Sequence, residues 1–312
     1  MTPLLLLAGA VSLYWTKGVE TVPELRKAGI RRVAVAPEQA EAWRKEGFEV
    51  VPTTTAAFAA RERLHAPGFA AQTDVASPTR SPWVFTNGWR FIRRRPGSYS
   101  YDVPPGKAAL AAAEAYAYDA DAALKVDPAD LEDLGRLSSF LADVPASDLP
   151  DVGDLAVVDD GSPLTGEVMN LLIRRNLLFV AARAPRPEYR INVRLGTKEF
   201  PKEAAADPSA FARRIRTLLG DDQRSLRLYG SEVVIARLTA APGRVRLHLL
   251  NYGGRSVDGL RVRLRGSYPA GEARVSGLGR VPLEDHVVAE GATEFTLARL
   301  GVYAVVDFPP AP

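Results

Sequence analysis

The stretch RVAVAPEQAEAWRKEGFEVVP, residues 32–52, contains one complete strand–helix–strand unit. Its first five residues form an apolar run rich in valine, and its last four (EVVP) form another. The segment between them, PEQAEAWRKEG, is amphipathic and opens with proline, which suits the first turn of a helix. We therefore predict strands over 32–36 and 49–52 with a helix over 37–47, an order that favours a parallel sheet.

Similar units extend from this stretch in both directions. The predicted strands are 13–15, 83–86, 122–126, 155–159, 177–182 and 191–195, and the predicted helices are 23–29, 56–64, 106–118, 128–141, 164–176 and 208–219. About eight strands in roughly 210 residues fit a (βα)-barrel. A doubly wound parallel sheet, with a subdivision near 145–150 (PASDLP), fits the same pattern. Both α/β architectures stay open at this stage.

The pattern changes after Gly220. Short runs such as EVVIARLTA and RVRLHLLNYG alternate apolar and polar residues, and turn residues separate them. This spacing is typical of an antiparallel β-sandwich, in which TAAPGR (239–244) forms a hairpin. We predict an α/β region over 11–222 followed by a C-terminal β-sandwich over 223–312.

Composition limits the classes of function. The 312 residues carry 40 basic and 37 acidic side chains, for a net charge of +3. Despite a pI near 9.1 there is no long basic run, so we expect no nucleic-acid partner. The chain has no cysteine and three histidines, which excludes disulfides and thiolate metal sites and disfavours a histidine metal site. We expect no metal and no cofactor.

The N-terminal run MTPLLLLAGAVSLYW combines an apolar segment with the small residues Ala8-Gly9-Ala10. Such a run resembles a secretory signal, so residues 1–10 are interpreted as a signal remnant, and a buried first strand is the alternative. No other segment approaches the ~20 apolar residues of a membrane span. We expect a periplasmic or secreted protein, with the cytoplasm as the alternative location.

Residues 81–110 (SPWVFTNGWRFIRRRPGSYSYDVPPGKAAL) concentrate aromatic and cationic side chains. Several glycines and prolines interrupt regular structure, so we predict a loop that presents Asn87, Trp89 and Arg90. Aromatic faces beside planar donors suit a sugar ring, an anionic group or a stacked base. The alternative is a buried tryptophan-rich strand with a solvated arginine rim.

Polar residues at the ends of predicted strands are the candidates for chemistry, since a barrel places its site there. They are Trp15 and Lys17 for binding, and Asp127, Asp159 and Asp160 for catalysis. Two of these aspartates would act as acid and nucleophile, or acid and base, if their carboxyls lay roughly 5 to 10 Å apart. The alternative for Asp127 is a helix N-cap, and for the DDG sequence it is a capping turn. No dinucleotide, Walker or nucleophile-elbow motif is present.

Three stretches carry a resemblance: VVDDGSPLTGEVMNLLIRRN (157–176), DPSAFARRIRTLLGDDQRSLRLYGSEVVIARL (207–238) and VRLHLLNYGGRSVDGLRVRLRG (245–266). They are similar to the tail of bacterial β-galactosidase-like glycoside hydrolases, where an amidotransferase-like α/β unit precedes a small β-domain. The resemblance covers about residues 150–308. It implies a catalytic barrel before that unit, but the usual pair of glutamates is missing from residues 11–145.

The resemblance implies a carbohydrate-active protein. The first hypothesis is a glycoside hydrolase that acts on a glycan through aspartates at strand ends. The alternative is a non-catalytic or degenerate carbohydrate-binding or structural protein. In a third reading the C-terminal sandwich is an oligomerisation module, so the expected partners are a glycan or small sugar and a further copy of the chain.

Overall fold

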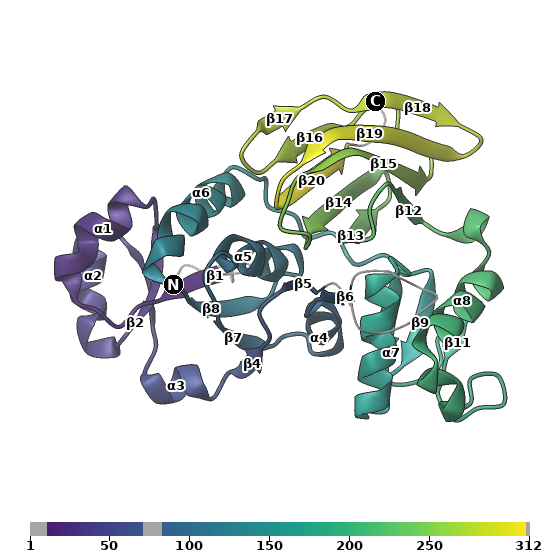
Figure 1. Cartoon of the computed structure of the whole chain (residues 1–312), viewed down its shortest axis with the longest axis horizontal. Helices are drawn as coiled ribbons and strands as arrows, with labels where there is room; N and C mark the ends of the chain where they lie inside the picture. The colour runs from purple at the N-terminus through teal and green to yellow at the C-terminus, as the bar shows by residue number, and fades with distance from the viewer. Residues whose placement is uncertain (1–10, 71–82, 310–312) are drawn as a thin grey trace. The chain divides into compact units, whose positions relative to one another are not determined.

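The computed structural model describes residues 11–70 and 83–309 (Figure 1). The predicted signal remnant at residues 1–10 lies outside them. The described chain forms two compact units. The first unit comprises residues up to 68 together with 94–145, and the second comprises 69–93 together with the chain from 146 onward.

The first unit contains a six-stranded parallel sheet of order β3-β2-β1-β8-β7-β4. The strands are β1 (Val11–Tyr14), β2 (Arg32–Val35), β3 (Glu49–Pro52), β4 (Glu62–Leu64), β7 (Ser98–Asp102) and β8 (Asp121–Lys125). From β4 through β7, β8, β1 and β2 to β3, neighbouring strands follow one another along the chain, with β8 beside β1, as in a (βα)-barrel. Among the described residues, however, β3 and β4 do not pair, so the sheet stays open. The prediction of a parallel α/β sheet is confirmed, whereas a closed barrel is not.

The helices of the first unit pack through small and apolar residues. They are α1 (Val22–Lys27), α2 (Ala40–Lys45), α3 (Thr55–Ala59), α5 (Ala108–Ala117) and α6 (Leu131–Ala142). Helix α5 is buried on nearly every side, which its run of alanines permits. Gly135 of α6 lies against the end of α1, where an added Cβ would be 1.5 Å from the Ala28 carbonyl oxygen. A side chain at this position would push the two helices apart.

Two segments of the first unit differ from the sequence predictions. The helix predicted over 56–64 ends at Ala59, and residues 62–64 form β4 instead. The C-terminal part of the predicted loop contains strand β7, in which Tyr99 and Tyr101 are fully buried. Tyrosine favours strands, and pairing with β4 and β8 satisfies the polar backbone of this segment.

The second unit begins with a small parallel sheet of order β10-β9-β11. Its strands are β9 (Leu155–Val158), β10 (Phe179–Ala182) and β11 (Asn192–Val193), and helices α7 (Pro163–Arg174) and α8 (Pro208–Leu219) accompany it (Figure 1). Strands β5 (Gly68–Ala70) and β6 (Trp83–Phe85) form a two-stranded sheet before helix α4 (Gly88–Arg93). The sixth, seventh and eighth predicted strands thus form a separate sheet, and the fourth, at 83–86, pairs with β5, so these strands do not complete a barrel. Short 3-10 turns are Val19–Thr21, Pro37–Gln39, Pro128–Asp130, Lys202–Ala206 and Asp221–Gln223.

The rest of the second unit is antiparallel, which confirms the predicted β-rich C-terminal part. One sheet has the order β12-β15-β19-β18 and the other β13-β14-β20-β16-β17. Their bounds are β12 (Leu226–Tyr229), β13 (Val234–Ala241), β14 (Arg244–Asn251), β15 (Val257–Arg265), β16 (Glu272–Val275), β17 (Gly279–Val281), β18 (Glu284–Ala289), β19 (Ala292–Leu300) and β20 (Tyr303–Phe308). Both sheets contribute to one hydrophobic core, and TAAPGR forms the predicted β13–β14 hairpin. In the described residues, no helix is both long and apolar enough to cross a bilayer.

Candidate functional site

A charged cavity lies at the carboxyl ends of the small parallel sheet in the second unit. Asp159 directly follows β9, Arg183 follows β10 and Arg194 follows β11. The cavity has a volume of about 370 Å³, and its lining also includes Val158, Asp160, Ala184, Pro185, Leu195 and Lys202. Carboxyl ends of parallel strands, where the strand order changes direction, are where open α/β sheets bind ligands.

Asp159 is held by an arginine from a distant part of the chain. Arg93 of α4 donates from Nε to Oδ2 at 2.8 Å and from an Nη atom to Oδ1 at 2.6 Å. The Gly161 amide donates a third hydrogen bond at 2.9 Å. Burial raises the pKa of Asp159, but the hydrogen bonds and the charge of Arg93 outweigh it, so the pKa lies below its usual value. Asp159 is therefore ionised at neutral pH.

Asp160 is bound to the start of α7. Hydrogen bonds from Ser162 and from the Thr165 hydroxyl lower the pKa of Asp160 to about 2. Ser162 in turn caps the helix by accepting from the Thr165 amide. The two adjacent aspartates are thus both anions, and neither holds the proton that a general acid must deliver.

The cavity is also lined by three exposed cationic side chains, Arg183, Arg194 and Lys202. No carboxylate in the described chain pairs with any of them. Their donors are free to reach a ligand, while the oxygens of Asp159 and Asp160 accept hydrogen bonds. A ligand whose hydroxyl groups both donate and accept would satisfy the two kinds of group together.

The Asp160 pKa gives a direct test of this geometry. Thr165→Val removes the hydroxyl that donates to Asp160 at 2.7 Å, so we expect the pKa to rise from about 2 toward the ordinary 3.8. Because the folded pKa is depressed, these bonds stabilise the protein fully above the ordinary pKa and progressively less as pH falls through about 2. NMR titration of the carboxyl checks the shift, with Thr217→Val as an exposed control. An unchanged Asp160 pKa in Thr165→Val would contradict the hydrogen-bond assignment.

The structure shows helix α4 at residues 88–93, where a loop was predicted. Asn87 is 2% exposed, and its carbonyl accepts the first hydrogen bonds of helix α4. Trp89 is 9% exposed, and its ring lies where a Cβ on Gly166 of α7 would come within 2.8 Å. Arg90 covers the ring at 4.4 Å from its centroid. The ring is therefore largely buried against α7, where glycine at 166 allows the close approach, and a role of Asn87, Trp89 and Arg90 in binding stays a prediction.

Trp15 and Lys17 lie together in the first unit. Trp15 is 6% exposed and donates from Nε1 to the Thr21 hydroxyl at 2.9 Å. Lys17 lies 5.0 Å from the ring centroid, and its ammonium is 4.0 Å from Glu24. The pair stabilises the turn after β1, and a role in binding stays a prediction.

Asp127 is observed as a helix cap. Its Oδ1 accepts from the Ala129 amide at 2.9 Å at the start of the turn before α6. It belongs to the first unit, whereas Asp159 and Asp160 belong to the second. The convergence of these aspartates in one catalytic site stays a prediction.

The sequence contains a signal for two of the three cations, Arg183 and Arg194, but not for Lys202. A charged residue directly follows each strand of the small sheet, and of these only Asp159, after β9, is among the predicted site residues. Arg93, the partner of Asp159, gave no such signal. Among the described residues, no group of three or more His, Cys, Asp or Glu side chains could hold a metal ion.

No protein-family model and no curated protein sequence matches the chain. Solved structures do match. An α-L-fucosidase isoenzyme 2 from Paenibacillus thiaminolyticus is 10% identical with a TM-score of 0.56, over 88% of this chain and 70% of that one. A GH42 β-galactosidase from G. stearothermophilus is 8% identical with a TM-score of 0.37, over 93% of this chain and 56% of that one.

The likeness to the fucosidase concerns the fold. It supports a glycoside-hydrolase-like layout, in which an α/β region precedes a β-rich part. The predicted resemblance to glycoside hydrolases is confirmed at this level, and no single family is indicated.

Proposed function

We propose that this chain is a carbohydrate-binding protein with a glycoside-hydrolase-like fold, and that it binds its ligand at the carboxyl edge of the β10-β9-β11 sheet. The observation that carries the proposal is the set of charged residues after the strands: Asp159, Arg183 and Arg194. A sugar hydroxyl both donates and accepts, so neighbouring carboxylates and guanidinium groups can bind it from two sides. The fold likeness to an α-L-fucosidase supports a sugar as the ligand class.

Binding is favoured over hydrolysis because of the protonation of the aspartates. Glycoside hydrolysis commonly needs one protonated carboxyl and one ionised carboxylate. The pKa values of Asp159 and Asp160 are both lowered, so this pair offers two anions. Hydrolysis through these residues and Asp127 is the second candidate, which the likeness to a hydrolase supports.

The binding proposal is tested by glycan-array screening followed by titration of the best ligand. Arg183→Gln combined with Arg194→Gln should weaken binding about tenfold or more, because hydrogen bonds from charged donors are lost. Both side chains are exposed, so the melting temperature should change little. Lys198→Gln, an exposed cation outside the cavity lining, is the matched control. Equal affinity in the double variant and the wild type would overturn the proposed site.

A screen on aryl glycosides separates the second candidate from the first. We expect no turnover, and Asp159→Asn should leave that result unchanged. Turnover that disappears in Asp159→Asn would instead establish the hydrolase.

We also propose export to the periplasm or the medium, from the N-terminal apolar run, and self-association through the C-terminal part.

A further inference from the structure

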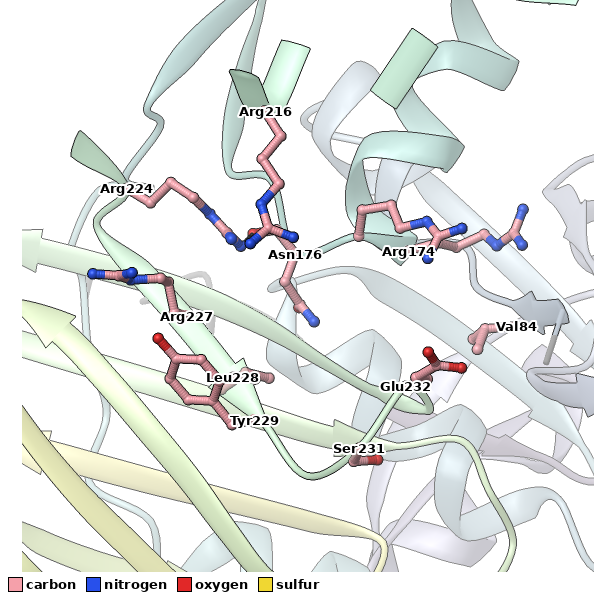
Figure 2. Close-up of a pocket in the computed structure, with 11 residues that line it drawn as sticks. Val84, Arg174, Asn176, Arg216, Arg224, Arg227, Leu228, Tyr229, Ser231 and Glu232 are labelled. Carbon is pink, nitrogen blue, oxygen red and sulfur yellow. Dashed lines mark hydrogen bonds between the residues drawn. The ribbon is translucent and has the colours of Figure 1, made fainter. Parts of the chain in front are cut away.

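A second cavity of the second unit is lined by five arginines (Figure 2). Its volume is about 260 Å³, below the ~300 to 1,000 Å³ of pockets for larger organic ligands, so it suits a small group. We call it the arginine pocket; its lining residues are Val84, Arg174, Arg175, Asn176, Arg216, Arg224, Arg227, Leu228, Tyr229, Ser231 and Glu232.

The arginines converge from separate elements. Arg174 ends helix α7 and Arg175 follows it, Arg216 lies on α8, Arg224 precedes β12, and Arg227 lies within β12. Figure 2 shows the guanidinium groups of Arg216 and Arg224 directed toward one another beside Asn176. Arginines at the end of a helix have an ordinary role in stabilising the helix dipole, which accounts for Arg174 and Arg175 at α7 and for Arg216 in the last turn of α8. It does not account for Arg224 and Arg227.

Charge compensation in the pocket is incomplete. Asp221 pairs with Arg216 and Arg224, and Asp222 pairs with Arg227. Glu232 also lines the pocket, and the charges of Glu167 and Asp154 act on Arg174 and Arg224, but Arg174 and Arg175 have no ion pair among the described residues. Two guanidinium groups therefore line the pocket without a paired carboxylate, in a partly enclosed space where charges interact more strongly than in open water.

Three donors in this pocket are buried and unsatisfied. The Nε atoms of Arg174, Arg224 and Arg227 have no hydrogen-bond partner among the described residues. The Arg224 side chain is only 6% exposed, and Arg227 is 15% exposed. Burying an N–H group without an acceptor costs stability, so such a cluster is unusual unless a ligand supplies the oxygens.

Arg174 is also held in place. Its guanidinium carbon lies 3.5 Å from the centroid of the Trp83 ring. Burial and the neighbouring Arg175 lower the pKa of Arg174 to about 10, so it stays charged at neutral pH. A fixed, planar and permanently charged group is a good partner for the flat or tetrahedral oxygen arrangement of an oxyanion.

We propose that the arginine pocket binds an oxyanion, either inorganic or as the sulfate or carboxylate group of a small organic ligand. The pocket shares no residue with the proposed carbohydrate cavity. It lies at the C-terminal end of α7, whereas Asp160 binds the N-terminal end of that 12-residue helix, about 18 Å away. The proposal therefore goes beyond sugar binding and stands independently of it.

The experiment measures thermal stability and calorimetric binding of the full chain with sodium sulfate, sodium glucuronate and sodium chloride at matched ionic strength. We expect saturable stabilisation by sulfate, by glucuronate or by both, and none by chloride. Sulfate also stabilises proteins generally by exclusion from their surface, which is not saturable and does not depend on one side chain. A response to sulfate alone indicates a tetrahedral anion, and a response to glucuronate alone indicates a sugar carboxylate.

Variants distinguish the pocket from a general salt effect. Arg174→Gln and Arg227→Gln should each weaken binding about tenfold, because one charge-assisted donor is lost. Arg213→Gln is the control, since Arg213 is exposed on α8 and does not line the pocket. Circular dichroism confirms that each variant is folded, and two separate variants prevent one unfolded protein from deciding the outcome. Equal effects of the three sodium salts on the wild type, or unchanged binding in both variants, would overturn the proposal.

Discussion

Trp89→Ala is expected to lower the free energy of unfolding by about 3 to 5 kcal/mol, while sugar binding per folded molecule stays unchanged. The ring is 9% exposed, packs against the α7 backbone at Gly166 and is covered by Arg90. Removing it leaves a cavity between α4 and α7 that neither helix can fill. Thermal and denaturant unfolding measure the loss, and titration with the best glycan measures binding.

Phe85→Ala is the matched control for this variant. Phe85 lies in neighbouring strand β6 and is 45% exposed, so removal of its ring leaves no enclosed cavity. We expect its unfolding free energy to stay within about 0.5 kcal/mol of the wild type. A Trp89→Ala protein of near-normal stability but weakened sugar binding would contradict the buried packing of the ring and support a role of Trp89 in binding.

Gly135→Ala is expected to destabilise the first unit by about 3 kcal/mol or more. Alanine improves helix propensity by about 1 kcal/mol over glycine, which alone would stabilise α6. The added Cβ, however, would lie 1.5 Å from the Ala28 oxygen and 2.6 Å from the Ala28 carbonyl carbon. Backbone atoms cannot rotate away, so α1 and α6 must separate, and overpacking of this severity exceeds the usual 1 to 3 kcal/mol.

Ser139→Ala on the same helix is the control, because Ser139 is exposed and its replacement also favours helix. Melting temperatures of the two variants separate the helix propensity from the steric clash. If Gly135→Ala were as stable as the wild type, the close contact between α1 and α6 would be wrong.

Much of the α/β layout is predictable because its strands are short apolar runs between amphipathic helices. Residues 32–52 form β2, α2 and β3 as their pattern indicates. Strand β7 is harder, since its SYSYD sequence has no aliphatic residue and follows several turn-forming residues. Its burial depends on β4 and β8, and a pattern within one segment does not contain that information.

The residues of the candidate site are also only partly predictable from the sequence, because some of their contacts join distant parts of the chain. Asp159 and Asp160 are visible as polar residues after an apolar strand. The ion pair of Asp159 with Arg93 joins residues 66 positions apart, and local sequence does not specify such a contact. The same contact changes the chemistry, because it keeps ionised a carboxyl that a catalytic acid would need protonated.

The open six-stranded sheet has a consequence for the association of copies of this chain. Among the described residues, no strand pairs with the outer side of β3 or of β4, and such an edge can recruit a strand from another molecule. Both are short: β3 ends at Pro52, which has no N–H to donate, and β4 carries Glu62 and Arg63. Proline and charged side chains disfavour strand addition. We therefore expect the open sheet to resist growth into intermolecular fibrils.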